Sequence, residues 1–498
     1  MKNQRKEEWL IRRVAVIGGG ISGLACAYDL KQAVTGLHVD LFESGPELGG
    51  AIQTRRTNGY VIEQGPTGFI NRNTSTLDLV DRLGLTDELI AGDGTHRRRY
   101  VLADGALRTF PTSAAEFLKS DLLTWGGKLR VLAEPFIARS KNQRDESVAE
   151  FVRRRFGSEA LDLLVSPFVS GLYAGETERL SVRATLPELK GLELRDKSIM
   201  WSLWKRGQRK SPAASDSDAS NQTTYVSFRQ GLSVLVDALR EALGDSIHVN
   251  APVRALTRVE HGWSLQTDSG DPTAMYDAVV SAVSADVTGR LLGQWDPAIL
   301  GHCEGVEHAP VAMVALGYRA SDVAHPLDGF GYLLSAREPG DVLGVLWNSS
   351  IYPGHRAPEG HVLLQVIVGG ARDYGVRTRS EEDVIHAAKR HLKSVLGIGV
   401  EPAHQAYFLH SRGLPQYAVG HKDRLERARA AFTALSGVYV IGNGFDGMGI
   451  NSCTAAAQTA ATDVIAYLSE RTRPTADSRA ERIGGEGSPQ LKLVASAS

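Results

Sequence analysis

The chain has 498 residues, of which 42% are hydrophobic and 23% are charged, and its formal net charge at pH 7 is −1. These are ordinary globular values, and the length is enough for about three domains. The near balance of 56 basic and 57 acidic residues excludes a concentrated basic surface, so we expect no nucleic-acid partner. Three widely separated cysteines favour neither a disulfide framework nor a zinc site, which is typical of a reducing compartment.

The apolar run from Val14 to Leu30 follows a charged N-terminus, an order that signal peptides share. Three consecutive glycines at 18–20 and Asp29 interrupt this run, so we interpret it as neither a signal peptide nor a membrane-spanning helix. We therefore expect a cytoplasmic protein.

Residues 13–30 predict a buried strand, a glycine turn and a helix. Gly18, Gly20 and Gly23 occupy the G-x-G-x-x-G positions of a dinucleotide-binding turn, whose helix N-terminus binds a pyrophosphate. A second predicted strand ends in Glu43, 20 residues after Gly23, where an acid accepts hydrogen bonds from the ribose hydroxyls. The cofactor-binding residues expected in this part of the chain are Gly18, Gly19, Gly20, Ile21, Ser22, Gly23, Glu43 and Ser44.

The segment after Glu43 separates two interpretations of the cofactor. An NAD-binding fold would continue with a helix and a strand, whereas this chain stays rich in turns, with Gly49-Gly50 and then Gly65-Pro66-Thr67-Gly68. This arrangement resembles the large flavoprotein group that includes monoamine oxidases and phytoene desaturases. The resemblance implies FAD, with the residues after the acid around the adenosine and the loop at 65–68 near the flavin.

The middle of the chain is expected to hold a helical segment and a return to the cofactor domain. Residues 112–138 mix large apolar residues with Lys and Arg, which indicates either ordinary core helices or a monotopic contact with a membrane. Residues 206–224 are polar and rich in Ser and predict a mobile loop. Strands and an amphipathic helix are expected over 225–300, and Val253 matches the position at which related flavoproteins contact the adenine.

A second glycine-rich turn, "GNGFDGMGINS" at 442–452, follows an apolar strand and precedes an Ala-rich helix. In the flavoproteins that the chain resembles, this turn returns to the same FAD, which implies cofactor contacts from Gly442, Gly444, Met448, Gly449 and Ile450. The alternative is an independent nucleotide site, but no later strand with a terminal acid follows it. Residues 471–498 predict a disordered tail.

Three strings resemble oxygen-dependent protoporphyrinogen oxidases: "SPFVSGLYAGETERLSVRATLPEL", "DGFGYLLSAREPGDVLGVLWNSSIYPGHRAPEG" and "GLPQYAVGHKDRL". The resemblance implies that Arg99 binds a propionate, that the Gly171 carbonyl faces the tetrapyrrole, and that Leu333 and Tyr352 enclose the macrocycle. Several relatives have Phe or Met where this chain has Tyr352, and a buried hydroxyl there needs a partner. A solvated strand edge for Arg99, and plain core packing for Leu333 and Tyr352, remain alternatives.

Together these features predict an α/β flavoprotein with a discontinuous Rossmann-like FAD domain at 1–97, 225–300 and 435–470. A helical, membrane-contacting or core segment is expected at 98–205, and a mixed-sheet substrate domain at 301–434. The resemblance implies oxidation of protoporphyrinogen IX by dioxygen with release of hydrogen peroxide, with no acid or base catalyst and no metal. Oxidation of coproporphyrinogen III, a flavin amine oxidase and a non-catalytic binding protein are the alternatives. Attachment to the inner face of the membrane and a homodimer are left open.

Overall fold

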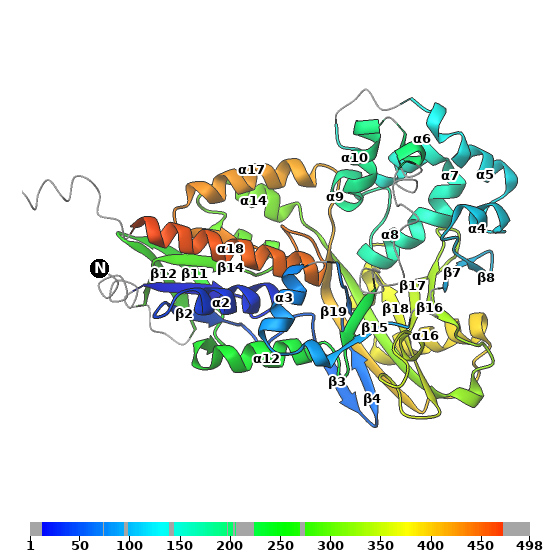
Figure 1. The fold of residues 1–498 in the computed structure, drawn as a ribbon, viewed down its shortest axis with the longest axis horizontal. Coiled ribbons are helices and arrows are strands. Elements are labelled where there is room, and N and C mark those ends of the chain that lie inside the picture. Colours follow the sequence, from blue (N-terminus) through cyan, green and yellow to red (C-terminus); the bar gives the residue numbers. More distant parts are fainter. Residues whose placement is uncertain are drawn as a thin grey trace, which may run out of the picture.

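The computed structural model describes residues 12–72, 74–93, 98–138, 144–196, 198–202, 205, 224–268 and 274–471. The expected mobile loop, apart from Thr224, and the expected tail, apart from Arg471, lie outside the described residues. Figure 1 shows a cofactor-type α/β part on one side, and a second large sheet with a group of helices above it on the other.

The α/β part is built on a five-stranded parallel sheet. The strand order across it is β10 (Ile247–His248), β2 (His38–Phe42), β1 (Arg13–Ile17), β14 (Ala278–Ser281) and β20 (Val438–Val440). The central strands β1 and β14 are almost entirely apolar, because helices or a second sheet cover both faces of a parallel sheet. Three distant parts of the chain therefore join in one sheet, as a discontinuous FAD domain requires.

One face of this sheet is covered by helices α2 (Ile21–Ala33), α12 (Ser233–Leu243) and α18 (Ile450–Arg471). In Figure 1 the long red-orange α18 lies beside the blue α2. Ala457, Ala460 and Ala461 are buried in the apolar cluster that joins α18, α2 and the sheet, and their small side chains let α18 lie close to both. The first and last segments of the chain thus bring their helix N-termini to the same edge of the sheet.

The opposite face carries a small antiparallel sheet of β11 (Val253–Val259), β12 (Gly262–Thr267) and β13 (Met275–Tyr276). Helices α13 (Ala285–Leu292), α14 (Pro297–Glu304) and α17 (His421–Ala434) pack there as well. Half of α14 and all of α17 fall within the segment expected to form the substrate domain. They join the cofactor part because Ile299 and Phe432 fill the same apolar cluster as Val279 and Val438 of the sheet.

The second large sheet has seven strands and is mixed, as expected. Its order is β19 (His404–Pro415), β15 (His308–Arg319), β18 (His361–Gly369), β17 (Val342–Trp347), β16 (Gly329–Leu334), β7 (Arg98–Ala103) and β8 (Ala106–Thr109). Helix α16 (Glu381–Leu396) covers one face. Strands β7 and β8, which the sequence led us to group with the helices, belong here because β7 pairs in parallel with β16.

The helical part therefore begins after β8. It contains α4 (Ala114–Lys119), α5 (Trp125–Leu132), α6 (Val148–Phe156), α7 (Ser158–Ala160), α8 (Ser166–Tyr173), α9 (Val182–Thr185) and α10 (Pro187–Asp196). Inside it, buried Glu134 pairs with buried Arg155 and accepts a hydrogen bond from the Ser198 hydroxyl at 2.7 Å. Within the described ranges, no helix is both long enough and apolar enough to span a membrane.

Smaller elements connect these parts. The hairpin β3 (Thr54–Thr57) and β4 (Tyr60–Glu63) precedes the expected flavin loop, and α3 (Thr74–Arg82) follows it. A three-stranded sheet of β5 (Phe69–Ile70), β9 (Tyr225–Phe228) and β6 (Leu89–Ala91) continues from that loop. The short helix α15 (Asn348–Ile351) leads into Tyr352.

Candidate active site

The first glycine turn leaves β1 at Gly18, whose φ of +107° favours glycine. A Cβ on Gly23 would overlap the carbonyl oxygen of Gly18, so the close packing of α2 against the turn requires glycine at 23. Gly20 is different, because a Cβ there would meet no atom within 4 Å. Open space therefore lies at the N-terminus of α2, where Gly20 provides no side-chain cap and the first turn has no acidic residue. Such an end binds an anion through its free N–H groups.

Glu43 stands at the end of β2 with both carboxylate oxygens oriented by the turn. One oxygen accepts a hydrogen bond from the Gly19 N–H at 2.7 Å, and the other accepts from the Gly45 N–H at 2.8 Å and from the Ser44 hydroxyl at 3.0 Å. Since each carboxylate oxygen has two lone pairs, the oxygen that accepts from Gly19 can still accept a hydrogen bond from a ribose hydroxyl.

Val253 lies close to this acid although it is far away in sequence. The N–H of Ala251 donates to the Glu43 carbonyl at 2.8 Å, and that of Asn250 donates to the Gly45 carbonyl at 3.0 Å. Val253 then begins β11, two residues after Ala251. These backbone bonds hold the start of β11 near Glu43, and the contact of Val253 with the adenine stays a prediction.

The doublet Gly49-Gly50 closes the side of the first turn. The Gly49 N–H donates to the Gly19 carbonyl at 2.7 Å, and Gly20 and Gly49 form a parallel bridge. Both glycines of the doublet have positive φ, +99° and +60°, which explains the use of glycine at both.

The second turn follows β20 and opens at the same edge of the sheet. Gly442 has a φ of +123° and donates its N–H to the Asp446 carboxylate at 2.9 Å. A Cβ on Gly449 would meet no atom within 4 Å, so the start of α18 also faces open space. Ile450 is buried beside Ile21 in one apolar cluster, whereas Met448 is half-buried. Two open helix N-termini at one edge fit a single elongated dianion, as the pyrophosphate of FAD would be.

The ends of the two helices also touch directly. Burial raises the pKa of the Cys453 thiol in α18, and the Ser22 hydroxyl of α2 lies close enough to oppose that shift. This contact supports one shared site and disfavours the alternative of two independent nucleotide sites.

The loop from Gly65 to Gly68 is held tightly on both sides. A Cβ on Gly65 would overlap the Ala51 carbonyl oxygen, and one on Gly68 would overlap the Tyr352 hydroxyl. Between them the half-buried Pro66 precedes Thr67, whose hydroxyl shares a hydrogen bond of 3.0 Å with the Tyr225 hydroxyl. The loop therefore has little freedom to move, and its contact with the flavin, which the resemblance implies, stays a prediction.

Tyr352 is 1% exposed and lies behind this loop. Its ring stacks on Tyr225 with 6.3 Å between centroids, and the Arg356 guanidinium lies 4.5 Å from its centroid on top of the ring. Burial raises the pKa of Tyr352 well above its ordinary value, so the phenol stays protonated. The Ser227 hydroxyl, which accepts a hydrogen bond from Arg356 at 2.8 Å, lies near the Tyr352 hydroxyl, but among the described residues the Tyr352 hydroxyl has no hydrogen-bond partner.

Gly171 and Leu333 lie in contact, while the roles toward a tetrapyrrole that the resemblance implies for them stay predictions. A Cβ on Gly171 would overlap the Leu333 side chain, so α8 lies directly on β16 at this point. A bulge in β16, with Gly331 at φ +125°, puts Phe330 and Leu333 on the sheet face away from α16. Both side chains are partly exposed there and form an apolar surface.

Arg99 reaches this surface from β7. Its exposed guanidinium lies 5.5 Å from the centroid of the Phe330 ring, and among the described residues it has no carboxylate partner. Its neighbour Arg98 points to the other side of the strand and pairs with Asp328 at 2.5 Å. The remaining member of the arginine triplet, at position 97, lies outside the described residues.

Aromatic contacts connect Arg99 with the flavin loop. Phe330 is 5.5 Å from Tyr225, measured between ring centroids, and Tyr225 in turn contacts Thr67 and Tyr352. Phe330 and Tyr225 were not predicted from the sequence, since single aromatic residues in a strand have no distinctive local pattern. Within the part of the chain that the structure describes, no group of His, Cys, Asp or Glu residues is placed to hold a metal ion.

Comparisons with known proteins agree with this geometry. A family model described as flavin containing amine oxidoreductase matches residues 21–465. The chain is 32% identical over 470 residues to coproporphyrinogen III oxidase of Bacillus subtilis (strain 168), covering 92% of this chain and 98% of the relative. It is 31% identical over 479 residues to protoporphyrinogen oxidase 1, chloroplastic, of Arabidopsis thaliana, covering 91% and 88%. A solved structure from Exiguobacterium sp. 255-15, assigned as a protoporphyrinogen oxidase, superposes with a TM-score of 0.78 at 26% identity, covering 91% of this chain and 98% of that one.

Proposed function

The chain belongs to the flavin containing amine oxidoreductase family, and on this premise we propose that it oxidises a porphyrinogen to the corresponding porphyrin. The observation that carries the proposal is the Arg99 guanidinium, which stands without a carboxylate partner among the described residues at the edge of the apolar surface of Phe330, Leu333 and Gly171. An apolar macrocycle that bears carboxylates matches such a surface, whereas a cationic amine does not.

Bound FAD supplies a hydride acceptor that dioxygen reoxidises, so each round removes two hydrogens from the substrate and produces one hydrogen peroxide. Conversion of a porphyrinogen to a porphyrin removes six hydrogens and therefore takes three rounds and three molecules of dioxygen.

The residues of this chain bind, orient and exclude water. The N–H groups at the starts of α2 and α18 bind the pyrophosphate, Glu43 binds the ribose, and the loop at 65–68 limits the flavin side of the site. Arg99 binds a propionate through a two-pronged contact that lysine cannot copy. The apolar surface around Leu333 orients the macrocycle and keeps water from the carbon that loses hydride.

Two porphyrinogens are candidates. Protoporphyrinogen IX is our first proposal, and the curated plant relatives carry that activity in their names. Coproporphyrinogen III is the second, because the Bacillus subtilis relative is named for it and aligns over 98% of its own length. The two substrates differ in their number of carboxylates, four in coproporphyrinogen III and two in protoporphyrinogen IX.

The test offers each porphyrinogen to the FAD-loaded protein without oxygen and follows the loss of flavin absorbance, then admits air and measures porphyrin fluorescence and peroxide. We expect rapid bleaching by one porphyrinogen and formation of its porphyrin in air. Bleaching by a primary amine, with no response to either porphyrinogen, would refute the proposal in favour of an amine oxidase.

We also propose a peripheral contact between the helical part and a membrane surface. Trp125, Leu129 and Leu132 lie at i, i+4 and i+7 of α5 and are 70%, 64% and 44% exposed. Phe136 continues this apolar face, and the Lys128 ammonium lies 4.5 Å from the centroid of the Trp125 ring. Lys128 itself is buried and donates to the Leu118 carbonyl at 2.9 Å, so the proposal rests on the exposed apolar helix face, which is typical of monotopic attachment. In Figure 1, α4 and α5 lie at the outer end of the molecule, where a membrane could reach them.

A further inference from the structure

The segment "GLPQYAVG", residues 413–420, passes from β19 to α17 and has no role in the function proposed above. Its two central side chains, Gln416 and Tyr417, are each only 5% exposed. Gln416 makes a hydrogen bond to the end of α8, which forms one wall of the candidate site, and Tyr417 makes one to the second glycine turn, which forms another. We call residues 413–420 the strap.

Gln416 holds the C-terminal end of α8. Its amide nitrogen donates to the Tyr173 carbonyl at 2.9 Å and to the Leu414 carbonyl at 3.1 Å. Tyr173 is the last residue of α8, two positions after Gly171, which contacts Leu333. The helix then ends at Ala174 in the left-handed region, with φ +48°, which is uncommon for a residue with a side chain. The Gln416 contact therefore helps to fix a helix end whose backbone does not favour that conformation by itself.

Tyr417 holds the second glycine turn. Its hydroxyl donates to the Asn443 carbonyl, between Gly442 and Gly444. Burial raises the pKa of Tyr417 well above its ordinary value, which keeps the hydroxyl a donor. The same ring contacts Tyr173 edge-on, with 6.2 Å between centroids, so this one side chain touches both walls.

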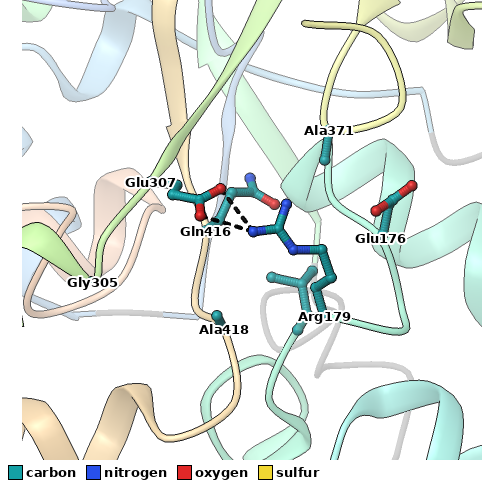
Figure 2. Close-up of a pocket in the computed structure, with 8 residues that line it drawn as sticks. Glu176, Arg179, Gly305, Glu307, Ala371, Gln416 and Ala418 are labelled. Carbon is teal, nitrogen blue, oxygen red and sulfur yellow. Dashed lines mark hydrogen bonds and ion pairs between the residues drawn. The ribbon is translucent and has the colours of Figure 1, made fainter.

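Backbone hydrogen bonds fix the strap along its length. The Ser181 N–H donates to the Tyr417 carbonyl at 2.8 Å, and the Val419 N–H donates to the Arg179 carbonyl at 3.0 Å. Figure 2 shows Gln416 beside the surface ion pair that Arg179 forms with Glu307 at 2.8 Å. The strap is therefore a rigid connection between the helical part, the seven-stranded sheet and the second turn.

We infer that Gln416 and Tyr417 are positioning residues that couple the binding of FAD to the binding of the porphyrin ring. The inference rests on the proposed function for the identity of the second ligand. When bound FAD orders the second turn, it holds the Asn443 carbonyl in place, and this carbonyl holds Tyr417 through its hydroxyl. The neighbouring Gln416 then holds the end of α8, which packs against Leu333. Because coupling between two binding sites is reciprocal, bound porphyrin must then raise the affinity for FAD by the same factor by which bound FAD raises the affinity for porphyrin.

The test measures equilibrium binding without turnover. In one titration FAD is added to the apo-protein and followed by flavin fluorescence, with and without saturating porphyrin. In the other, protoporphyrin IX or coproporphyrin III is added and followed by porphyrin absorbance, with and without FAD. In the unmodified protein we expect each ligand to tighten the other by about fivefold or more, the usual lower range for coupled sites.

Two variants each remove one hydrogen bond and keep the packing. Tyr417→Phe should weaken the binding of FAD by about five- to tenfold, the loss expected for one hydrogen bond. Gln416→Met should weaken the binding of the porphyrin by a similar factor. In both variants the coupling factor should fall below about twofold, since coupling is a property of the connection. In turnover, Gln416→Met should raise KM and leave kcat nearly unchanged. If Gln416→Met does not fold, Gln416→Asn removes the same contact with a smaller change.

Arg179→Gln is the matched control, because it removes an ion pair at the same junction whose partners are 46% and 54% exposed. Exposed pairs of this kind contribute little, so both affinities and the coupling should stay as in the unmodified protein. Retention of full coupling in Tyr417→Phe and Gln416→Met would overturn the inference. If the unmodified protein binds neither porphyrin, the proposed function fails, and equal FAD affinity in Tyr417→Phe would then overturn the role of the strap as well.

Discussion

Substitution of Gly20 tests the first glycine turn in a way that separates cofactor binding from folding. Gly20 has φ −74° and ψ 174°, a conformation that valine adopts readily, and a Cβ there would meet no protein atom within 4 Å. Gly20→Val should therefore cost at most about 1 kcal/mol of stability, the scale of an unfavourable helix N-cap. The two added methyl groups would instead occupy the space in front of the α2 N–H groups, where the pyrophosphate binds.

Loss of even two charged hydrogen bonds to the pyrophosphate, at about 1.5–3 kcal/mol each, weakens FAD by roughly a hundredfold or more. The protein should therefore purify colourless but folded. The assay combines flavin absorbance after gel filtration with a thermal unfolding curve of the apo-protein, because bound FAD would itself raise Tm.

Gly23→Ala is the contrasting variant in the same turn. Its new Cβ would overlap the Gly18 carbonyl oxygen, which is backbone and cannot move aside cheaply, so this variant should lose stability even without cofactor. A Gly20→Val protein that retains full FAD occupancy would refute the placement of the pyrophosphate at the start of α2.

Three further predictions follow from other parts of the structure. Arg99→Ala should raise KM for the porphyrinogen by about ten- to a hundredfold with normal flavin content, and Arg99→Lys should recover only part of that loss. Arg98→Ala is the control and should leave KM unchanged, because Arg98 pairs with Asp328. An unchanged KM in Arg99→Ala would mean that Arg99 is only a solvated residue at the strand edge. Replacing the exposed Trp125 by Ser should reduce co-flotation of the protein with anionic lipid vesicles, and detergent rather than salt should release the bound unmodified protein. Complete absence of flotation in the unmodified protein would contradict the membrane contact. Burial lowers the pKa of His302 to about 4 and that of His421 to about 3, so between about pH 6.5 and 4 the unfolded chain binds more protons than the folded one. The free energy of unfolding should therefore fall as the pH drops through this range, by up to about 1.4 kcal/mol per pH unit for each histidine. Urea unfolding of His302→Phe should show a shallower fall of this free energy with pH, and the same slope as in the unmodified protein would disprove the role of His302.

The features that the sequence determined are those written in consecutive residues. The strand, glycine turn and helix at 13–33, the acid at Glu43 and the second turn at 442–450 each depend on backbone conformations and spacings within a few residues. The family match confirms the flavoprotein class and with it the expected FAD. The meeting of the two turns could be expected as well, because the second turn lacks a following strand with a terminal acid and the flavoproteins that the chain resembles return this turn to the same FAD.

Contacts between distant segments were decided by tertiary structure. The pairing of β7 with β16 moved residues 98–109 from the helices to the large sheet, since a strand's partner depends on which edge is free and not on its own pattern. Phe330, Gln416 and Tyr417 lie in strings that carry the resemblance and Tyr225 lies in none, but all four acquire a role only when β16, β9 and the strap come together around one site. Tyr352 could be placed near the pocket by resemblance, but only packing put its hydroxyl against Gly68 and its ring under Arg356, because burial is a property of everything that surrounds a side chain.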